Sequence, residues 1–314
     1  TLMIKSCVIG LSKIGLIHCD TLIKLKNTQL TYVYDSNSKL RTKYAKQFKC
    51  NTSKNFNEIL NKKDIGLFVI ASPTTTHEFY INKLIQRKKM IYCEKPILMN
   101  SKKLKSLTKK IRGKKIRFCI GLNRRFSKGY LKMKKLSKNK SIKRIKIISK
   151  SSNWDAKLSS RNGGLFADKG FHFFDLACWF GSSKPKELIV TQALSSKEYL
   201  KQNDYSEAVV QMKLKNNIFV KFIFSRYSQS GNIEQIKLYG RNININSDKF
   251  FNKKILSKDF SIKFRDSYHE CLKSFISKNK REQLFKEGIE AQLISDAALK
   301  SAKSDKKLKF LNKI

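Results

Sequence analysis

The sequence predicts an α/β protein in two parts: an N-terminal Rossmann domain with a doubly wound parallel sheet, and a C-terminal domain with an open-faced, largely antiparallel sheet. A glycine-rich turn between a first apolar run and a helical pattern indicates the Rossmann domain. Up to about Asn123, apolar runs alternate with helical patterns, as in βαβ units; later runs alternate apolar with polar residues. The 314 residues also exceed what one hydrophobic core usually serves.

In the first part, short apolar runs are expected to form strands, and the segments between them helices. The expected strands are Met3–Ile9, Leu30–Tyr34, Gly66–Ala71, Met90–Cys93 and Arg117–Leu122. The expected helices are Ile14–Leu25, Lys39–Phe48, Asn55–Leu60, His77–Arg87 and Lys102–Arg112. We therefore place an NAD-binding domain at residues 1–122.

The second part is expected to form a sheet that an apolar helix, Phe171–Phe180, interrupts, and the end, Tyr268–Lys303, is expected to be helical again. The expected strands are Ile142–Ser149, Glu187–Ala193, Ala208–Leu214, Ile218–Phe224 and Ile233–Leu238. We assign residues 123–285 to a substrate and oligomerisation domain, and residues 286–314 to a C-terminal helix.

The chain is strongly basic, with a formal net charge of +45 from 68 basic and 23 acidic residues. A basic surface would suit nucleic acid. However, the lysines are spread over the whole chain and do not interleave with aromatic residues in an RNA-binding motif. The Lys, Asn and Ile content that an AT-rich genome produces therefore explains the charge better, and no specific nucleic-acid partner is expected.

Seven cysteines occur and none forms a C-x-x-C pair, so reduced thiols are expected rather than disulfides or a metal site. No apolar run approaches the length of a membrane span, and the first residues do not resemble a secretion signal. A cytoplasmic protein without a membrane partner is the expectation.

The turn from Gly10 to Gly15 has the pattern G-x-S-x-x-G. Gly10 would allow the tight turn, and Gly15 close packing of the helix on the strand, while Ser12 replaces the central glycine of the usual fingerprint. The helix amides after Ser12, from Lys13 and Ile14 onward, would hold the phosphates of a dinucleotide.

Asp35 ends the second predicted strand, 20 residues after Gly15. A carboxylate there would accept hydrogen bonds from the adenosine ribose and repel the 2′-phosphate of NADP. NAD(H) is therefore the preferred cofactor, with NADP(H) left open. An ordinary turn beside a strand-end aspartate is the competing interpretation.

Two further strand ends carry candidate cofactor-binding residues. After the Gly66–Ala71 strand these are Ser72, Pro73, Thr74 and His77, although His77 could simply begin a helix. After Met90–Cys93 they are Glu94 and Lys95; such a pair is usually solvated, but a partly desolvated lysine there could hold a substrate hydroxyl.

The segment from Gly163 to Asp175 carries a candidate catalytic pair. Asp168 and His172 are four residues apart, so a helical turn would place both on one face. Such a pair is often only a structural hydrogen bond. Asp175 is expected either to orient His172 or to anchor the helix.

Together these residues resemble the glucose–fructose oxidoreductase/inositol dehydrogenase family, often called Gfo/Idh/MocA. The resemblance runs along nearly the whole chain. It rests on the Gly10–Gly15 turn, Asp35, the Pro73–His77 loop, the triplet Glu94-Lys95-Pro96, the segment Asn123-Arg124-Arg125-Phe126, the Asp168–Asp175 block and the alanine-rich final helix.

The resemblance implies an enzyme that transfers a hydride between a nicotinamide cofactor and a secondary alcohol or ketone of a sugar, cyclitol or sugar derivative. It implies a catalytic set of Lys95, Asp168 and His172, with His172 as general base, Lys95 on the same hydroxyl and Asp168 orienting the substrate. Asn123, Arg124 and Asp155 would join Asp168 and His172 in binding substrate. No metal is implied.

The resemblance further implies a homo-oligomer, dimer or tetramer, formed through the sheet face, and a C-terminal helix that packs back toward the first domain. Lys169 departs from the pattern, because an apolar residue would be unremarkable there. Two alternatives stay open: a UDP-sugar type dehydrogenase or reductase, whose anionic substrate the positive field would attract, and a non-catalytic NAD-binding regulatory protein.

Overall fold

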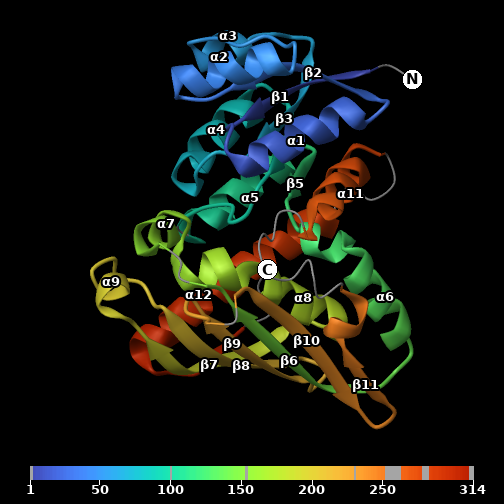
Figure 1. Cartoon of the computed structure of the whole chain (residues 1–314), viewed down its shortest axis with the longest axis vertical. Coiled ribbons are helices and arrows are strands. Elements are labelled where there is room, and N and C mark those ends of the chain that lie inside the picture. Colours follow the sequence, from blue (N-terminus) through green and yellow to red (C-terminus); the bar gives the residue numbers. More distant parts are fainter. Residues whose placement is uncertain are drawn as a thin grey trace. The chain divides into compact units, whose positions relative to one another are not determined.

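The computed structural model describes residues 3–99, 101–152, 155–229, 231–251, 263–277 and 283–310 (Figure 1). The chain forms two compact units: an N-terminal unit of Thr1–Asn123 with Arg265–Ile289, and a C-terminal unit of Arg124–Phe264 with Glu290–Ile314. The expected domain of residues 123–285 thus differs from the observed unit, because residues 265–285 belong with the Rossmann sheet.

A parallel five-stranded sheet with the order β2-β1-β3-β4-β5 forms the centre of the N-terminal unit, as the sequence predicted. Its strands are β1 (Ile4–Ile9), β2 (Thr28–Tyr34), β3 (Ile65–Ile70), β4 (Met90–Cys93) and β5 (Phe118–Ile120). Nearly all residues of β3, β4 and β5 are buried, because helices cover both faces of the sheet.

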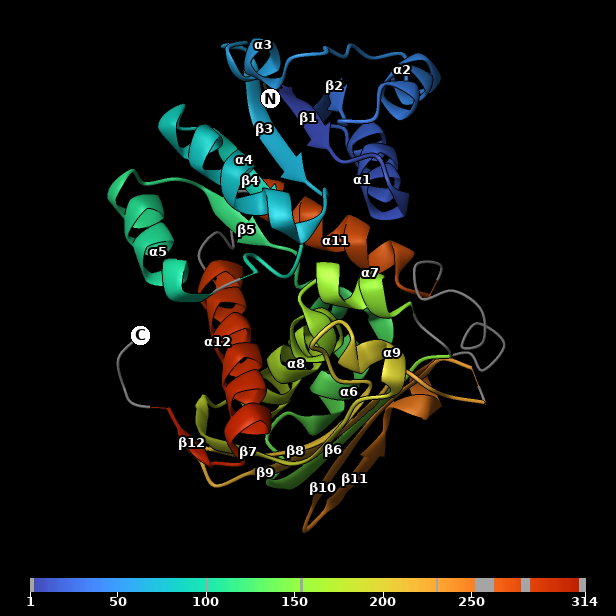
Figure 2. The same ribbon diagram turned by 90° about the vertical axis from the view of Figure 1, so that its left-hand side faces the viewer.

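Helices α1 to α5 connect successive strands, and α1 and α11 pack side by side on one face while α4 and α5 cover the other (Figure 2). They are α1 (Lys13–Lys24), α2 (Ser38–Gln47), α3 (Phe56–Leu60), α4 (Thr74–Gln86), α5 (Leu104–Gly113) and α11 (Arg265–Ile276), with short 3₁₀ turns at Ser101–Lys103 and Asn123–Phe126. Helix α11 joins the unit because Tyr92 contacts Cys271 and Arg117 donates to the Phe275 carbonyl. Sequence periodicity cannot reveal such a tertiary contact.

A seven-stranded sheet with the order β11-β10-β6-β9-β8-β7-β12 forms the C-terminal unit. Its strands are β6 (Ile142–Lys150), β7 (Pro185–Leu194), β8 (Glu207–Leu214), β9 (Phe219–Ser225), β10 (Ile233–Gly240), β11 (Ile243–Asn246) and β12 (Leu308–Lys309). Only β6 and β9 pair in parallel, so the prediction of a largely antiparallel sheet is confirmed.

Helices cover one face of this sheet (Figure 2). They are α6 (Lys128–Ser137), α7 (Ala156–Arg161), α8 (Phe171–Gly181), α9 (Lys197–Leu200) and α12 (Gln283–Ser304), of which residues 290–304 belong to this unit; a 3₁₀ turn covers Ser247–Phe250. A π-helical segment, Leu165–Gly170, leads directly into the almost fully buried α8. The helical segment expected over Tyr268–Lys303 contains α11 and α12, and residues 278–282 within it lie outside the described residues.

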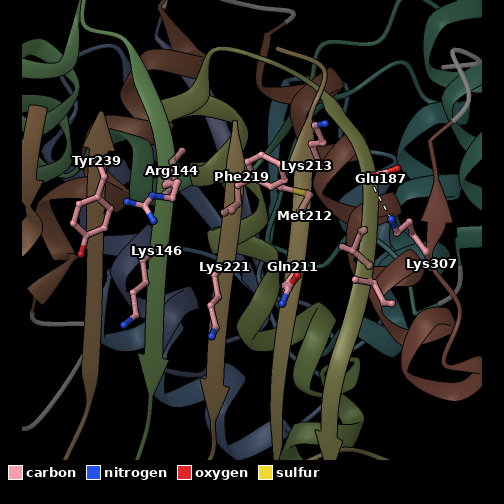
Figure 3. Close-up of a pocket in the computed structure, with 14 residues that line it drawn as sticks. Arg144, Lys146, Glu187, Gln211, Met212, Lys213, Phe219, Lys221, Tyr239 and Lys307 are labelled. Carbon is pink, nitrogen blue, oxygen red and sulfur yellow. Dashed lines mark ion pairs between the residues drawn. The ribbon is translucent and has the colours of Figure 1, made fainter. Parts of the chain in front are cut away.

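The other face of the C-terminal sheet carries long polar side chains around a groove of about 450 Å³ (Figure 3). Lys146 of β6 lies directly opposite Lys237 of β10 on one side and Lys221 of β9 on the other. Arg144, in the next row, is flanked by the aromatic residues Tyr239 and Phe219. These three lysines on adjacent strands make this part of the face strongly basic, and their like charges repel one another.

No helix within the described ranges is both long and apolar enough to cross a membrane. None of the seven cysteines is paired in a disulfide within the described residues, and five of them are buried: Cys7, Cys19, Cys93, Cys119 and Cys271. Burial raises the pKa of the Cys93 thiol well above its ordinary value, so it is an unreactive core group.

Candidate active site

Two glycines shape the loop between β1 and α1. Gly10 has a φ of +92°, and a Cβ on it would lie 2.5 Å from the amide nitrogen of Ser72. A Cβ on Gly15 would collide with the carbonyl oxygen of Gly10. Ser12 precedes α1 in an extended conformation, and its side chain does not cap the helix. The turn therefore requires glycine at both ends and leads into a helix N-terminus, an environment that favours phosphate.

Asp35 closes this loop from the end of β2. One oxygen of its carboxylate accepts a hydrogen bond from the amide of Leu11 at 2.8 Å, and the other accepts from the amide of Asn37 at 2.9 Å. The guanidinium of Arg41 donates to the main-chain carbonyl of Asp35 at 2.8 Å. The carboxylate is thus held beside the glycine turn rather than merely ending a strand.

The residues of this edge fit a nicotinamide dinucleotide. Gly10 provides a backbone without a Cβ at a close approach, Lys13 and Ile14 begin the helix whose amides would face phosphate, and Asp35 offers acceptor oxygens for ribose hydroxyls. Ser72 lies against Gly10, so the β3 loop borders the same turn.

Hydroxyl groups brace the loop after β3. The Ser72 and Thr76 hydroxyls lie 2.7 Å apart, and that of Thr76 donates to the Pro73 carbonyl at 2.8 Å. Thr74 is buried and begins α4, directly after Pro73. These contacts give the loop a single shape beside the glycine turn.

His77 is buried within α4 and touches two loops. Its Nε2 lies 2.9 Å from the Ser72 carbonyl oxygen, and its Nδ1 lies 2.9 Å from the Pro96 carbonyl oxygen. Burial lowers the pKa of His77, although its bonds to the two carbonyls oppose the shift. His77 therefore connects the β3 and β4 loops, beyond merely starting a helix.

Glu94, directly after β4, is a buried side chain and not half of a solvated pair. Its carboxylate lies 2.7 Å from Nε2 of His18, which is fully buried on α1. Gly121 leaves the room for this carboxylate, because a Cβ there would lie 2.9 Å from it. Lys95 follows as a half-buried residue, joined to Pro96 by a cis peptide bond. The lysine is thus carried by a firmly held loop.

Asp168 lies in the π-helical segment and forms an ion pair with Arg226, which directly follows β9. The Asp168 Oδ2 to Arg226 Nη2 distance is 2.8 Å, and Arg226 also donates to the Ser159 hydroxyl at 3.1 Å. The guanidinium is almost completely buried, whereas the carboxylate keeps some exposure. The ion pair therefore fixes the orientation of the Asp168 carboxylate at a partly accessible position.

His172 is buried in the first turn of α8, and Asp175 lies one turn further along. The Asp175 carboxylate accepts two hydrogen bonds from Arg125, at 2.6 and 2.8 Å. Burial raises the pKa of Asp175, and the Arg125 charge opposes that shift. Asp175 was expected either to orient His172 or to anchor the helix, and its ion pair with Arg125 supports the anchoring role.

Lys169 sits among charged residues, two arginines and two carboxylates. Desolvation lowers the pKa of Lys169 to about 7, and the charge of Arg226 adds to the effect, while Glu234 and Asp168 oppose it. Glu234 in turn pairs with Arg124 at 3.2 Å. The carboxylates of Glu234 and Asp168 therefore partly offset the cost of burying a lysine where an apolar residue would be unremarkable.

The three other expected substrate-binding residues have structural partners. Asn123 is fully buried and donates to the Ser267 hydroxyl at 3.1 Å. Arg124 stacks over the ring of Phe264, 3.4 Å from its centroid, besides pairing with Glu234. Asp155 is exposed and its carboxylate caps α7. Their expected substrate contacts stay predictions.

The groups that hold the candidate catalytic residues were not predicted from the sequence as supports. Arg125 belongs to one of the family motifs, whereas His18 and Arg226 lie outside them. His18 is 76 residues from Glu94, and Arg226 is 58 residues from Asp168. A sequence signal for His18 existed, since it lies on the helix that the glycine turn opens; Arg226 had none.

The fold and these loops define a two-domain oxidoreductase with a dinucleotide-binding N-terminal domain. The family model "Oxidoreductase family, NAD-binding Rossmann fold" matches residues 4–122, and the "GFO/IDH/MocA C-terminal domain" matches residues 131–245. The chain belongs to the Gfo/Idh/MocA family, as the sequence motifs indicated.

Similarity to known proteins extends over the whole chain. The myo-inositol 2-dehydrogenase of Thermotoga maritima is 25% identical, and the match covers 96% of this chain and 97% of that protein. The crystal structure of a myo-inositol dehydrogenase from Corynebacterium glutamicum has a TM-score of 0.89 at 21% identity, covering 99% and 100% of the two chains. That of the Lactobacillus casei scyllo-inositol dehydrogenase with NAD(H) and scyllo-inositol has a TM-score of 0.86 at 18% identity, covering 98% and 99%.

Proposed function

We propose that this protein is an NAD(H)-dependent dehydrogenase that oxidises a secondary alcohol of a cyclitol or sugar, or reduces the corresponding ketone. The observation that carries the proposal is the Glu94-Lys95-Pro96 loop, which is held beside the loop that borders the dinucleotide turn. Inositol dehydrogenases among the relatives support the cyclitol class. A bound nicotinamide supplies the hydride acceptor, or the donor in reverse.

In this proposal Lys95 donates a hydrogen bond to the substrate hydroxyl. An ammonium placed there stabilises the alkoxide character that develops while the carbinol carbon loses its hydride. The firmly held backbone around Lys95 limits the motion of its stem, and such orientation contributes directly to rate.

His172 takes the hydroxyl proton as general base and returns it in the reductive direction. Asp168 accepts a hydrogen bond from a neighbouring substrate hydroxyl, and its pairing with Arg226 fixes the orientation of the carboxylate for that purpose. The Arg125–Asp175 pair supports the helix that carries His172. The proton and the hydride thus leave the same alcohol group.

NAD(H) is the preferred cofactor in this proposal, because the Asp35 carboxylate would repel a 2′-phosphate. Arg41, which donates to the Asp35 main chain, is a nearby cation that could attract such a phosphate if the carboxylate were removed. The preference therefore depends on one side chain.

A nucleotide-sugar dehydrogenase or reductase is the second candidate, favoured by the net charge of +45, which attracts anionic substrates. A non-catalytic NAD-binding protein would keep the glycine turn without needing Lys95, Asp168 and His172. The presence of all three residues supports the enzyme.

The test is a screen of NAD⁺- and NADH-linked turnover over inositols, aldoses, keto-sugars and UDP-sugars. We expect the highest kcat/KM with a cyclitol or simple sugar. Turnover confined to UDP-sugars would favour the second candidate. NADH binding without turnover on any of these compounds would favour the regulatory protein.

Association into a dimer or tetramer through the open sheet face stays a prediction. The lysine row of Lys237, Lys146 and Lys221 opposes close self-pairing at low ionic strength. We therefore expect association, if it occurs through this face, to strengthen as salt increases.

A further inference from the structure

We infer that His18 and His77 are positioning residues that fix Lys95 from both sides. Lys95 lies between Glu94, whose carboxylate meets His18, and Pro96, whose carbonyl meets His77. Both histidines are buried, at 0% and 1% exposure, and neither is part of the proposed proton transfer. The inference rests on the proposed function only in taking Lys95 as the catalytic lysine.

His18 connects the lysine loop to the dinucleotide turn. It lies on α1 one turn beyond Gly15, and its Nε2 is 2.7 Å from the Glu94 carboxylate. The rings of Tyr92 and Tyr268 pack edge-on against the imidazole, with centroid distances of 5.1 and 5.8 Å. The ring is therefore held in one orientation, and a displacement of α1 would be transmitted to Glu94.

His77 connects the lysine loop to the β3 loop. Its two nitrogens face two carbonyl oxygens, which only accept hydrogen bonds, so a neutral ring donates to one of them at a time. Ser72, one of these partners, also lies against Gly10. Through His77, the position of Pro96 is thus set relative to the turn that would bind the pyrophosphate.

These two contacts make the glycine turn, the β3 loop and the lysine loop one connected assembly within the N-terminal unit. The loss of a positioning residue should affect turnover and dinucleotide binding differently from the loss of a purely structural residue. Loss of either histidine should lower turnover through Lys95 while the glycine turn still binds the dinucleotide, because within the described residues neither side chain hydrogen-bonds to Gly10 or Asp35.

His269 provides a control, because it is the last of the four histidines of the chain and is partly exposed on α11. We would compare His18→Gln with His18→Leu, and His77→Asn with His77→Leu, against His269→Leu. The amide variants keep a donor near the lost Nε2 or Nδ1, respectively, whereas the leucine variants keep only volume. Steady-state kcat, the KM values and NADH fluorescence titration would be measured for each folded variant.

We expect the leucine variants to lose kcat by on the order of 100-fold, the effect of misplacing a catalytic group by about 1 Å. NADH affinity should change less than about threefold, the amide variants should recover about tenfold or more of the loss, and His269→Leu should match the wild type. A folded leucine variant with wild-type kcat would overturn the inference, as would amide variants no better than leucine ones. If a leucine variant fails to fold, the amide variant and the exchange measurement below decide.

Hydrogen exchange measured by mass spectrometry gives a readout independent of activity. We expect the peptide spanning Cys93–Leu98 to exchange about tenfold faster in His18→Gln, His18→Leu and the His77 variants than in the wild type, with His269→Leu unchanged. Unchanged exchange would contradict the inference. If Lys95→Met retained full turnover while the exchange result held, the proposed function would fail and the positioning of Lys95 would stand.

Discussion

The two sheets of this protein carry their functional residues in different ways. In the N-terminal unit, buried parallel strands end at one edge, and the candidate residues occupy the loops there, held by histidine side chains. In the C-terminal unit they lie in a helical segment on the covered side of an open-faced sheet, held by arginines. The proposed reaction therefore depends on two kinds of support, which different substitutions should disturb.

The largest expected effect is on the arginine support. Replacing Arg125 by Met leaves the buried Asp175 carboxylate without its ion-pair partner, which should cost about 3–5 kcal/mol of unfolding free energy. Urea unfolding monitored by circular dichroism would measure it. Lys103→Met, which breaks an exposed pair with Glu78, is the control and should cost less than about 1 kcal/mol. Equal losses of unfolding free energy in the two variants would show that the buried ion pair is no more costly to break than the exposed one.

The next effect concerns Lys169 and depends on pH. Its pKa is about 7 when folded against 10.5 ordinarily, so between these values the unfolded chain binds more protons and stability rises with pH. The slope is at most about 1.4 kcal/mol per pH unit. Lys169→Met removes this contribution, so its stability relative to wild type should be greatest near pH 7 and decline toward pH 10. Thermal melts of both proteins at pH 7, 8.5 and 10 would show this, and a pH-independent difference would contradict it.

Cofactor choice should respond to substitution of Asp35. Asp35→Ser removes hydrogen bonds from a charged acceptor, worth about 1.5–3 kcal/mol, so the ratio of kcat/KM for NAD⁺ over NADP⁺ should fall about 10- to 150-fold. Arg41 should account for part of any gain in kcat/KM with NADP⁺. Adding Arg41→Met to Asp35→Ser should therefore reverse that part of the gain. An unchanged ratio in Asp35→Ser would remove the carboxylate from the explanation.

The smallest effect is expected on the open sheet face. Lys146→Thr removes the middle charge of the row formed by Lys237, Lys146 and Lys221. The change should raise the unfolding free energy by about 0.2–1 kcal/mol at low salt. The gain should disappear near 0.5 M salt, where exposed charges are screened over only a few ångströms (about 4 Å). Lys105→Thr, an exposed lysine on α5, is the comparison variant. A gain that persists at high salt would point to strand propensity and not to charge.

The fold was predictable because its periodicities are strong. Apolar runs such as that of β3 and the alternation along β6 identified both sheets, and the glycine turn located the dinucleotide edge. Helix α6 was missed although its buried residues Tyr130, Met133 and Ser137 fall at helical spacing, so a sequence signal for it was present. The division between the units was not predictable, because α11 joins the first sheet through contacts with residues far away in sequence.

The candidate site was predictable where chemistry and strand ends coincide, as at Asp35 and Lys95. Its supports were not, because a hydrogen bond between His18 and Glu94 or an ion pair between Asp168 and Arg226 depends on how distant segments pack. Sequence spacing can place Asp168 and His172 on neighbouring turns, but it cannot tell which cation neutralises Asp168.

The central claim is that Lys95 and His172 act on the same alcohol group. The direct measurement is kcat with the best substrate of the screen for Lys95→Met, His172→Gln and the double variant, after NADH binding has been verified for each. We predict that each single change lowers kcat by about 10²–10⁴-fold and that the double variant is little worse than the more impaired single one, as for groups that work as a unit. Wild-type turnover in either single variant, or losses that multiply in the double variant, would contradict the account.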